Sequence, residues 1–291
     1  MELHNDPNWL RAGHWIGNSP EADLAIVGIG ASKSAITPNK SYLTPDAIRE
    51  ALLRFSTFET FTGIDLAEKI KAVDFGNLSE PDDQFKSSLE LETISNKYLI
   101  LLGGDNSITF TGVNALAAKV GFENIGLITL DAHYDLRDGI SNGSPVRQLI
   151  EAGLPGNQIV QIGISDFANS KFYAERARSA GIKVIARQNI SDINLEEIVR
   201  DALVFLTKAK FIYVDIDIDV CDRSVVPAAP AALPGGLSAN QLLNLVYLLA
   251  KNRKVNNFDI TEIDASIDSP DKRTTRLAAL CILKIAAAKA L

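Results

Sequence analysis

The sequence predicts a three-layer α/β protein in which helices cover both faces of an eight-stranded parallel sheet. Short, nearly all-apolar runs rich in β-branched residues recur along the chain, as strands buried on both faces do. Helical patterns separate these runs, and this alternation is typical of right-handed crossovers between parallel strands. No linker-like stretch and no internal repeat divides the 291 residues. We therefore expect one domain over residues 1–291, with residues 1–20 as an N-terminal arm.

The apolar runs and helical patterns alternate in a regular order. Strands are expected at residues 24–29, 70–74, 98–102, 125–130, 158–162, 183–186, 211–217 and 257–262. Helices are expected at residues 45–55, 83–95, 108–120, 169–180, 195–207, 239–250 and 274–289. Open parallel sheets bind their ligands beyond the carboxyl ends of the strands. We therefore expect the functional residues in the loops that follow strands, and three of these loops have unusual polar residues.

Charge balance and run length exclude several classes of function. Lys and Arg number 29 against 36 Asp and Glu, a net charge of −7, which argues against nucleic acid as a partner. No apolar run approaches the roughly 20 residues of a membrane span. Two cysteines are too few for a disulfide-stapled secreted protein, and the first twenty residues do not resemble a signal peptide. We therefore expect a cytoplasmic protein without a membrane partner.

The third expected strand runs into two glycines and then Asp105, Asn106 and Ser107. The glycines let the backbone turn tightly before the next helix, which would hold Asn106 and Ser107 at the turn. Taken alone, the segment is better explained as a plain helix N-cap, because Asp, Asn and Ser are all favoured there.

The fourth expected strand is followed by Asp131, His133 and Asp135 at alternate positions. In an extended chain such positions point to one side. Two carboxylates and an imidazole gathered there would repel and desolvate one another unless a cation lay among them. The alternative is a solvated loop with an incidental histidine. With three histidines in the whole chain, a His-rich metal site is nearly excluded.

The seventh expected strand ends in Asp215, Asp217 and Asp219, which would share one face. Because Asp is disfavoured in strands, this pattern indicates a cation site. Asp131, Asp135, Asp217 and Asp219 together supply enough negative charge to balance two divalent cations. Carboxylates with one imidazole suit Mn²⁺ better than structural Zn²⁺. Because a metal pair can activate a bound water, the implied chemistry is hydrolysis.

Other kinds of reaction centre lack the residues they need. Residues 28–33 begin like a dinucleotide-binding turn, but Lys33 stands where the third glycine is required. No P-loop, G-x-S-x-G or H-E-x-x-H motif is present in the sequence. Cys221 has no spare histidine to act as its base, so it is better explained as a buried thiol.

The polar loops, in this order and at these separations, resemble the ureohydrolase superfamily of arginases, agmatinases and formimidoylglutamases. The resemblance covers most of the chain and rests on segments 103–107, 131–135, 217–236 and 261–264. It implies an arginase-like fold, a Mn²⁺ pair, and attack of hydroxide on the carbon of an amidine or guanidine. Members of the superfamily form homo-oligomers, so the resemblance implies a homo-oligomer here too.

The resemblance also assigns metal-binding roles. It implies that Asp131 and Asp217 bridge both metal ions. Asp135 then completes one site, and His133 with Asp219 completes the other. Asp131 is also a candidate catalytic residue through the water that the metals activate.

Glu262 resembles the acid that pairs with the cationic nitrogen of the substrate, since a carboxylate can accept two parallel hydrogen bonds from a planar amidinium. The alternative for Glu262 is an ion pair with Arg273 or Lys272. Asn106 stands where arginases and agmatinases usually have His, so its metal site is expected to bind weakly or to be empty. Asn142 lies in the loop where arginases have a further His, and we take it as a candidate catalytic and substrate-binding residue, although the usual proton shuttle is missing.

Residues 131–147 and 161–170 most resemble the bacterial formimidoylglutamases, which implies hydrolysis of N-formimidoyl-L-glutamate to glutamate and formamide. Arg137 favours an anionic substrate, because it can bind a carboxylate with two hydrogen bonds. Arg147 is a weaker candidate for a second such contact, since a solvated helix-face arginine is the simpler explanation. The alternatives are a guanidinobutyrase-like or agmatinase-like hydrolase that releases urea, and a non-catalytic homologue.

Overall fold

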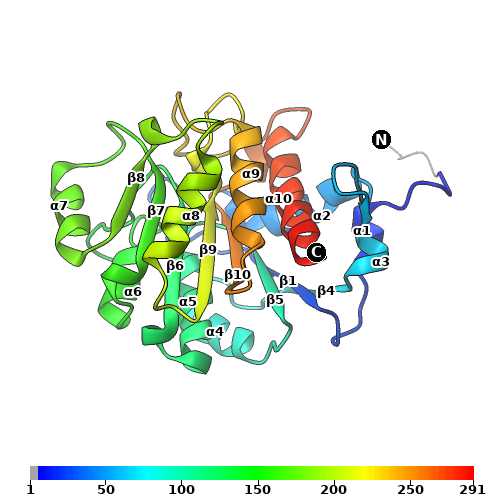
Figure 1. The fold of residues 1–291 in the computed structure, drawn as a ribbon, viewed down its shortest axis with the longest axis horizontal. Helices are drawn as coiled ribbons and strands as arrows, with labels where there is room; N and C mark the ends of the chain where they lie inside the picture. The colour runs from blue at the N-terminus through cyan, green and yellow to red at the C-terminus, as the bar shows by residue number, and fades with distance from the viewer. Residues whose placement is uncertain (1–5) are drawn as a thin grey trace.

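The computed structural model describes residues 6–291, and in this part of the chain eight strands form one parallel sheet (Figure 1). The spatial order of the strands is β4 (Ala72–Asn77), β1 (Leu24–Ile29), β5 (Tyr98–Gly103), β10 (Val255–Thr261), β9 (Phe211–Asp217), β6 (Ile125–Leu130), β7 (Ile159–Ile164) and β8 (Lys183–Ala186). All neighbours in this order pair in parallel. The predicted strands are confirmed, with ends that differ by a few residues at most.

Helices cover both faces of this sheet. One face is covered by α2 (Thr44–Leu52), α8 (Leu195–Phe205), α9 (Ala239–Ala250) and α10 (Arg273–Lys289). The other is covered by α4 (Gln84–Glu92), α5 (Ser107–Val120), α6 (Pro145–Ala152) and α7 (Lys171–Ala180). Successive strand residues point to opposite faces, so Ile100 packs in the first of these two cores and Leu101 in the second. The predicted three-layer architecture is therefore confirmed.

Several short elements were not predicted. They are helices α1 (Ala12–Trp15) and α3 (Leu66–Lys69), helix α6, and an antiparallel hairpin of β2 (Phe58–Glu59) and β3 (Ile64–Asp65). Single 3₁₀ turns are η1 (Ser41–Leu43), η2 (Phe122–Asn124), η3 (Gly156–Gln158), η4 (Arg187–Asn189), η5 (Ile218–Val220) and η6 (Ala265–Ile267).

The N-terminal arm expected over residues 1–20 is described from residue 6 onward, and residues 1–5 lie outside the described part. Ala12 is buried, and the indole nitrogen of Trp15 donates to the carbonyl of Ile70 at 2.9 Å. Gly17 forms a parallel bridge with Val73 on the edge strand β4. This part of the arm therefore packs along the β4 edge of the sheet.

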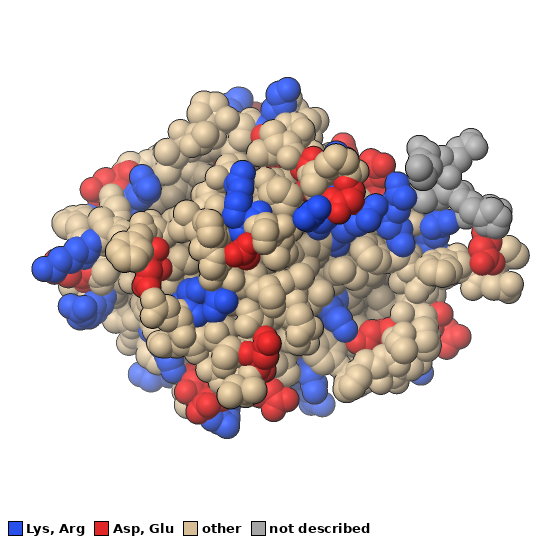
Figure 2. Space-filling view, turned by 90° about the horizontal axis from the view of Figure 1, so that it is seen from above, with Lys and Arg blue, Asp and Glu red and all other residues tan. Residues whose placement is uncertain are grey.

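The polar loops follow β5, β6, β9 and β10, which are four neighbouring central strands. The loops after β9 and β10 lie at the top of the molecule in Figure 1, at the carboxyl ends of the strands. Figure 2 shows this face from above, with acidic and basic side chains interspersed over it. No helix among residues 6–291 is long and apolar enough to cross a membrane.

Candidate metal centre and active-site pocket

A cavity of about 400 Å³ opens at the carboxyl ends of the central strands. It is lined by seven of the predicted site residues: His133, Asp135, Arg137, Asn142, Asp217, Asp219 and Glu262. Residues far apart in the sequence therefore meet in one pocket, because the strands that precede them are neighbours in the sheet.

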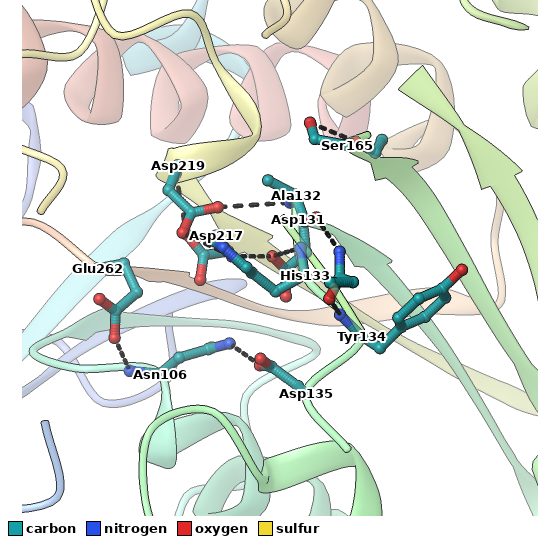
Figure 3. A network of polar contacts seen from close by, with 12 residues as sticks. Asn106, Asp131, Ala132, His133, Tyr134, Asp135, Ser165, Asp217, Asp219 and Glu262 are labelled. Atoms are coloured by element: carbon teal, nitrogen blue, oxygen red, sulfur yellow. Dashed lines mark hydrogen bonds and ion pairs between the residues drawn. The ribbon is translucent and has the colours of Figure 1, made fainter. Parts of the chain in front are cut away.

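Asp131, His133 and Asp219 form the tightest part of the site (Figure 3). One ligand atom from each lies within 4.8 Å of the others. His133 Nδ1 is 3.1 Å from Asp219 Oδ2 and 3.4 Å from Asp131 Oδ1. The second oxygen of Asp131 is buried and has no hydrogen-bond partner within residues 6–291. A buried carboxylate oxygen without a donor, beside a second carboxylate, is what a cation site requires.

The backbone after β6 differs from the extended chain that the alternating pattern predicts. Asp131 is the first residue beyond the strand, and its amide donates to the Ile162 carbonyl at 3.0 Å. The amide of His133 donates to Asp131 Oδ1 at 2.6 Å. Asp135 then adopts a left-handed φ of 54°, which is uncommon outside glycine. The chain therefore turns within the motif, and this turn leaves Asp135 in the same pocket as His133.

The end of β9 also departs from simple alternation. Asp217 is the last strand residue, whereas Asp219 lies in η5, and Asp217 Oδ1 accepts a hydrogen bond from the Asp219 amide at 2.9 Å. Asp215, expected on the same face as these two, instead lies deeper in the sheet beside Asp259 of β10. Asp215 does not line the pocket. The predicted set of three is therefore corrected to two, because Asp215 lies two residues before the carboxyl end of β9, within the sheet and not at its edge.

Asn106 lies beside the acids but presents its amino group to them. Its Nδ2 donates to Asp135 Oδ2 at 2.5 Å. Its oxygen, the side-chain atom that could bind a metal, accepts from the hydroxyls of Thr109 at 2.8 Å and Thr261 at 3.0 Å. Two hydroxyl groups hold the amide with its oxygen turned away from Asp135, and direct metal binding by Asn106 stays a prediction.

Glu262 follows β10 with a left-handed φ of 60° and a buried side chain. Its Oε1 accepts from the Asn106 amide and from Asn142 Nδ2, both at 2.8 Å. Its other oxygen has no hydrogen-bond partner among residues 6–291. No ion pair to Arg273 or Lys272 is present in this described range, so the structural alternative for Glu262 is not found. Burial raises its pKa to about 8.

The acids of the site are too buried to carry their full charge unaided. Burial raises the pKa of Asp131 to about 6, and burial with repulsion between the acids raises those of Asp135 and Asp217 well above their usual range. Burial also opposes charge on Asp219 and His133, but their mutual attraction outweighs it. The pKa of Asp219 is lowered and that of His133 is raised to about 12. A bound cation would offset this buried negative charge. The ligand types, carboxylate oxygens with one imidazole, fit a borderline-hard divalent cation such as Mn²⁺.

The two predicted substrate-binding arginines occupy different places. Arg137 is exposed at the pocket and makes no ion pair with any residue of the described range. Arg147 is outside the pocket lining, and its guanidinium donates to the Arg137 carbonyl at 2.7 Å, to the Gly139 carbonyl and to Glu151. All three nitrogens of the Arg147 guanidinium thus have partners within the fold, and its contact with substrate stays a prediction.

The sequence did not single out the neutral side of the pocket, formed by Ile36, Thr37, Asn39, Asn169, Ser170 and Tyr173. These residues come from the loop after β1 and from the segment before and within α7. Asn169 and Ser170 lie in segment 161–170, which contributed to the family resemblance, but uncharged residues have no charge pattern that would identify them individually.

The fold and the site together define a parallel α/β protein with an acid-lined centre suited to divalent cations. The arginase family model matches residues 22–287, and the chain belongs to this family.

Relatives with known names resemble this chain over most of its length. The formimidoylglutamase of Halalkalibacterium halodurans is 36% identical over 275 residues, which cover 89% of this chain and 85% of that protein. The crystal structure of formimidoylglutamase from Bacillus subtilis superposes with a TM-score of 0.91 at 28% identity, covering 100% of this chain and 95% of that chain. A Trypanosoma cruzi formiminoglutamase structure with Mn²⁺ shares the fold, with a TM-score of 0.86 at 20% identity over 97% of this chain and 99% of that chain.

Proposed function

We propose that this protein is a Mn²⁺-dependent hydrolase that converts N-formimidoyl-L-glutamate and water to glutamate and formamide. One observation carries the proposal. A single pocket joins a buried acid cluster to an unpaired arginine, Arg137, and to a free oxygen on Glu262. These features match a substrate that has a cationic amidine at one end and carboxylates at the other. The names of the relatives at 36% and 28% identity support the same substrate.

The residues that would hold the metal pair are Asp131, His133, Asp135, Asp217 and Asp219. Their oxygens and single imidazole suit Mn²⁺, and Mn²⁺ is the ion named with the Trypanosoma cruzi relative. When bound, such a pair lowers the pKa of water so that hydroxide is available at neutral pH. Asn106 supports this set through its hydrogen bond to Asp135 rather than through its own oxygen.

Glu262 orients the amidine in this proposal. Its Oε1 is held by the Asn106 amide and by Asn142, which leaves the other oxygen to accept an N–H of the formimidoyl group. Addition of water to the formimidoyl carbon and cleavage of its bond to the glutamate nitrogen release formamide, and the glutamate nitrogen takes up a proton. A positioned carboxylate supports both steps, because it stabilises the positive charge on the amidine nitrogens.

Arg137 supplies the selectivity for an anionic tail. A cationic tail such as that of agmatine would be repelled by its guanidinium, whereas a carboxylate would receive up to two hydrogen bonds. A guanidino acid has the same pattern of charge, so product analysis must separate the two. Incubation with N-formimidoyl-L-glutamate and, separately, with guanidinobutyrate should give formamide from the first and little urea from the second. Urea release from guanidinobutyrate that is faster than formamide release from N-formimidoyl-L-glutamate would overturn the substrate assignment. No turnover of either substrate would favour a non-catalytic homologue.

We also infer a cytoplasmic homo-oligomer. Cys221 and Cys281 are both free and buried, as in proteins of reducing compartments. The resemblance to the ureohydrolase superfamily, whose members form homo-oligomers, supports the second point, the association of copies. Sedimentation analysis of the purified protein tests the second point, and a monomer at micromolar concentration would contradict it.

A further inference from the structure

The segment that includes Asp135 and Arg137 leaves the sheet after β6, and several side chains donate hydrogen bonds to its backbone. The ladder between β6 and β7 ends at the pair Leu130 and Ile162. Beyond it, the Ala132 carbonyl accepts hydrogen bonds from the Ser165 amide at 3.0 Å and from Asn169 Nδ2 at 2.9 Å. Carbonyls beyond the end of a ladder need other donors, and this chain supplies some of them from side chains.

Two arginines continue this support along residues 136–139. Arg176 of α7 donates to the Leu136 carbonyl at 2.6 Å and to Asp138 Oδ1 at 2.8 Å. Arg147 of α6 donates through Nε to the Arg137 carbonyl at 2.7 Å and through Nη2 to the Gly139 carbonyl. The backbone on both sides of Arg137 is therefore fastened to two helices.

The side chains of both arginines are largely withdrawn from solvent, with exposed fractions of 15% for Arg147 and 27% for Arg176. A planar guanidinium can bridge two acceptors at once, which a lysine ammonium does less rigidly. The stem of Arg137 also contacts the loop itself. A Cβ added at Gly143 would lie 2.8 Å from Arg137 Cδ, so the stem packs directly on the Gly143 backbone.

We propose that Arg147 and Arg176 are positioning residues for anion recognition. By holding the carbonyls of residues 136–139, they keep Arg137 directed into the pocket and thereby set the affinity for the carboxylate-bearing substrate. The inference rests on the proposed function for its substrate, but its structural part, a loop held by two arginines, can be tested without one.

The experiment is a double-mutant cycle on the metal-loaded enzyme. Arg147→Ala should raise KM for N-formimidoyl-L-glutamate by about tenfold and change kcat much less, because a charge-assisted grip on one carboxylate is worth about that factor. An uncharged N-alkylformamidine should show a much smaller change in KM. In an Arg137→Ala background, Arg147→Ala should add little, since the group that it positions is gone. Arg176→Ala should behave in the same way.

Two variants act as controls. Arg178→Ala removes a positive charge from the same helix as Arg176 without removing a hydrogen bond to the loop, and it should leave KM unchanged. Arg147→Lys keeps the charge but loses the two-pronged donor, so its KM should stay raised. Full recovery of KM in Arg147→Lys would mean that charge alone acts, and the proposal would be wrong.

Additive effects of Arg137→Ala and Arg147→Ala would also overturn the proposal, because they would indicate that each arginine binds a carboxylate directly. If the wild type releases no glutamate, the proposed function fails separately. Amide hydrogen exchange then decides the structural part. Arg147→Ala should speed exchange in residues 136–143 at least about tenfold with the rest of the sheet unchanged, and equal exchange would contradict the inference.

Discussion

Asn142 donates a hydrogen bond to Glu262, with Nδ2 2.8 Å from Oε1, and the Asn142 oxygen accepts the amide of Ile36 at 3.0 Å. One side chain thus connects the loop after β1 to the acid that we assign to substrate orientation. The contact fixes one carboxylate oxygen and leaves the other available, which makes Asn142 a positioning residue for Glu262.

Replacing Asn142 should therefore lower activity. We expect Asn142→Ala to reduce kcat/KM by about tenfold, because a hydrogen bond to a buried carboxylate is lost. Asn142→Asp should cost more, because a second carboxylate would face Glu262. Steady-state kinetics with saturating Mn²⁺ give both values, and melting curves check that the variants fold. Normal kcat/KM in Asn142→Ala would show that Glu262 needs no such support.

Arg137→Ala should separate substrates by the charge of their tails. We expect KM for N-formimidoyl-L-glutamate to rise about tenfold to a hundredfold, with a far smaller change for an uncharged formamidine. The reason is that Arg137 makes no ion pair within the described residues and lines the pocket, so its loss removes a contact with the substrate and no ion pair within the fold. Equal effects on both substrates would contradict its assigned role.

Asn106→His should tighten Mn²⁺ binding. Imidazole is a stronger ligand than an amide, and Asn106 is already within hydrogen-bond distance of the proposed ligand Asp135. Isothermal calorimetry on metal-free protein should show an increase in affinity of about tenfold for at least one site. Unchanged affinity would place the metal pair away from this position.

The metal-free protein should become less stable as the pH rises. Burial raises the pKa of Asp131 and Asp259 to about 6 and that of Glu262 to about 8. In the unfolded chain these groups lose their protons near pH 4, so the folded state binds more protons over the window from about pH 4 to pH 8. The stability that these three groups contribute is fully present below this window and is lost as the pH rises through it. We expect Tm to fall by about 5 °C or more between pH 6 and pH 8.

Calorimetry with and without Mn²⁺ tests this expectation. Bound metal replaces the missing protons, so the stabilisation by Mn²⁺ should be larger at the higher pH. His133, whose pKa is raised to about 12, contributes stability that is lost in the same direction and does not reverse the trend. A metal-free Tm that stays level or rises over the same window would contradict the buried-acid description of the site.

Most of the fold could be predicted because the apolar runs of strands and the periodic patterns of helices involve residues that are close together in the sequence. Each strand that the sequence predicted is present, whereas helix α6 was missed. Its eight residues start at Pro145 within a polar segment, for which no helix range was predicted although a helix-face position was favoured for Arg147. The convergence of Asp131, Asp217 and Glu262 was predictable too, since each lies at or just beyond the carboxyl end of a parallel strand, and such ends share one edge of the sheet.

The orientation of individual side chains could not be predicted in the same way. The left-handed backbone at Asp135 and Glu262 is imposed by the packing around each turn, not by residue type. The amide of Asn106 is turned by Thr109 and Thr261, and the second of these lies 155 positions away. Arg147 was expected near the substrate because its charge is visible in the sequence, but the carbonyls that it holds are not. Long-range hydrogen bonds decide these details.

Glutamate release from N-formimidoyl-L-glutamate is the most direct test of the central claim that the acid cluster and Arg137 form a metal-dependent amidine hydrolase. The purified protein is assayed after incubation with Mn²⁺, after chelation, and as Glu262→Gln with Mn²⁺. We expect release only with Mn²⁺, and a loss of at least about a hundredfold in the variant. No release by folded, Mn²⁺-loaded wild-type protein, or equal release after chelation, would contradict the claim.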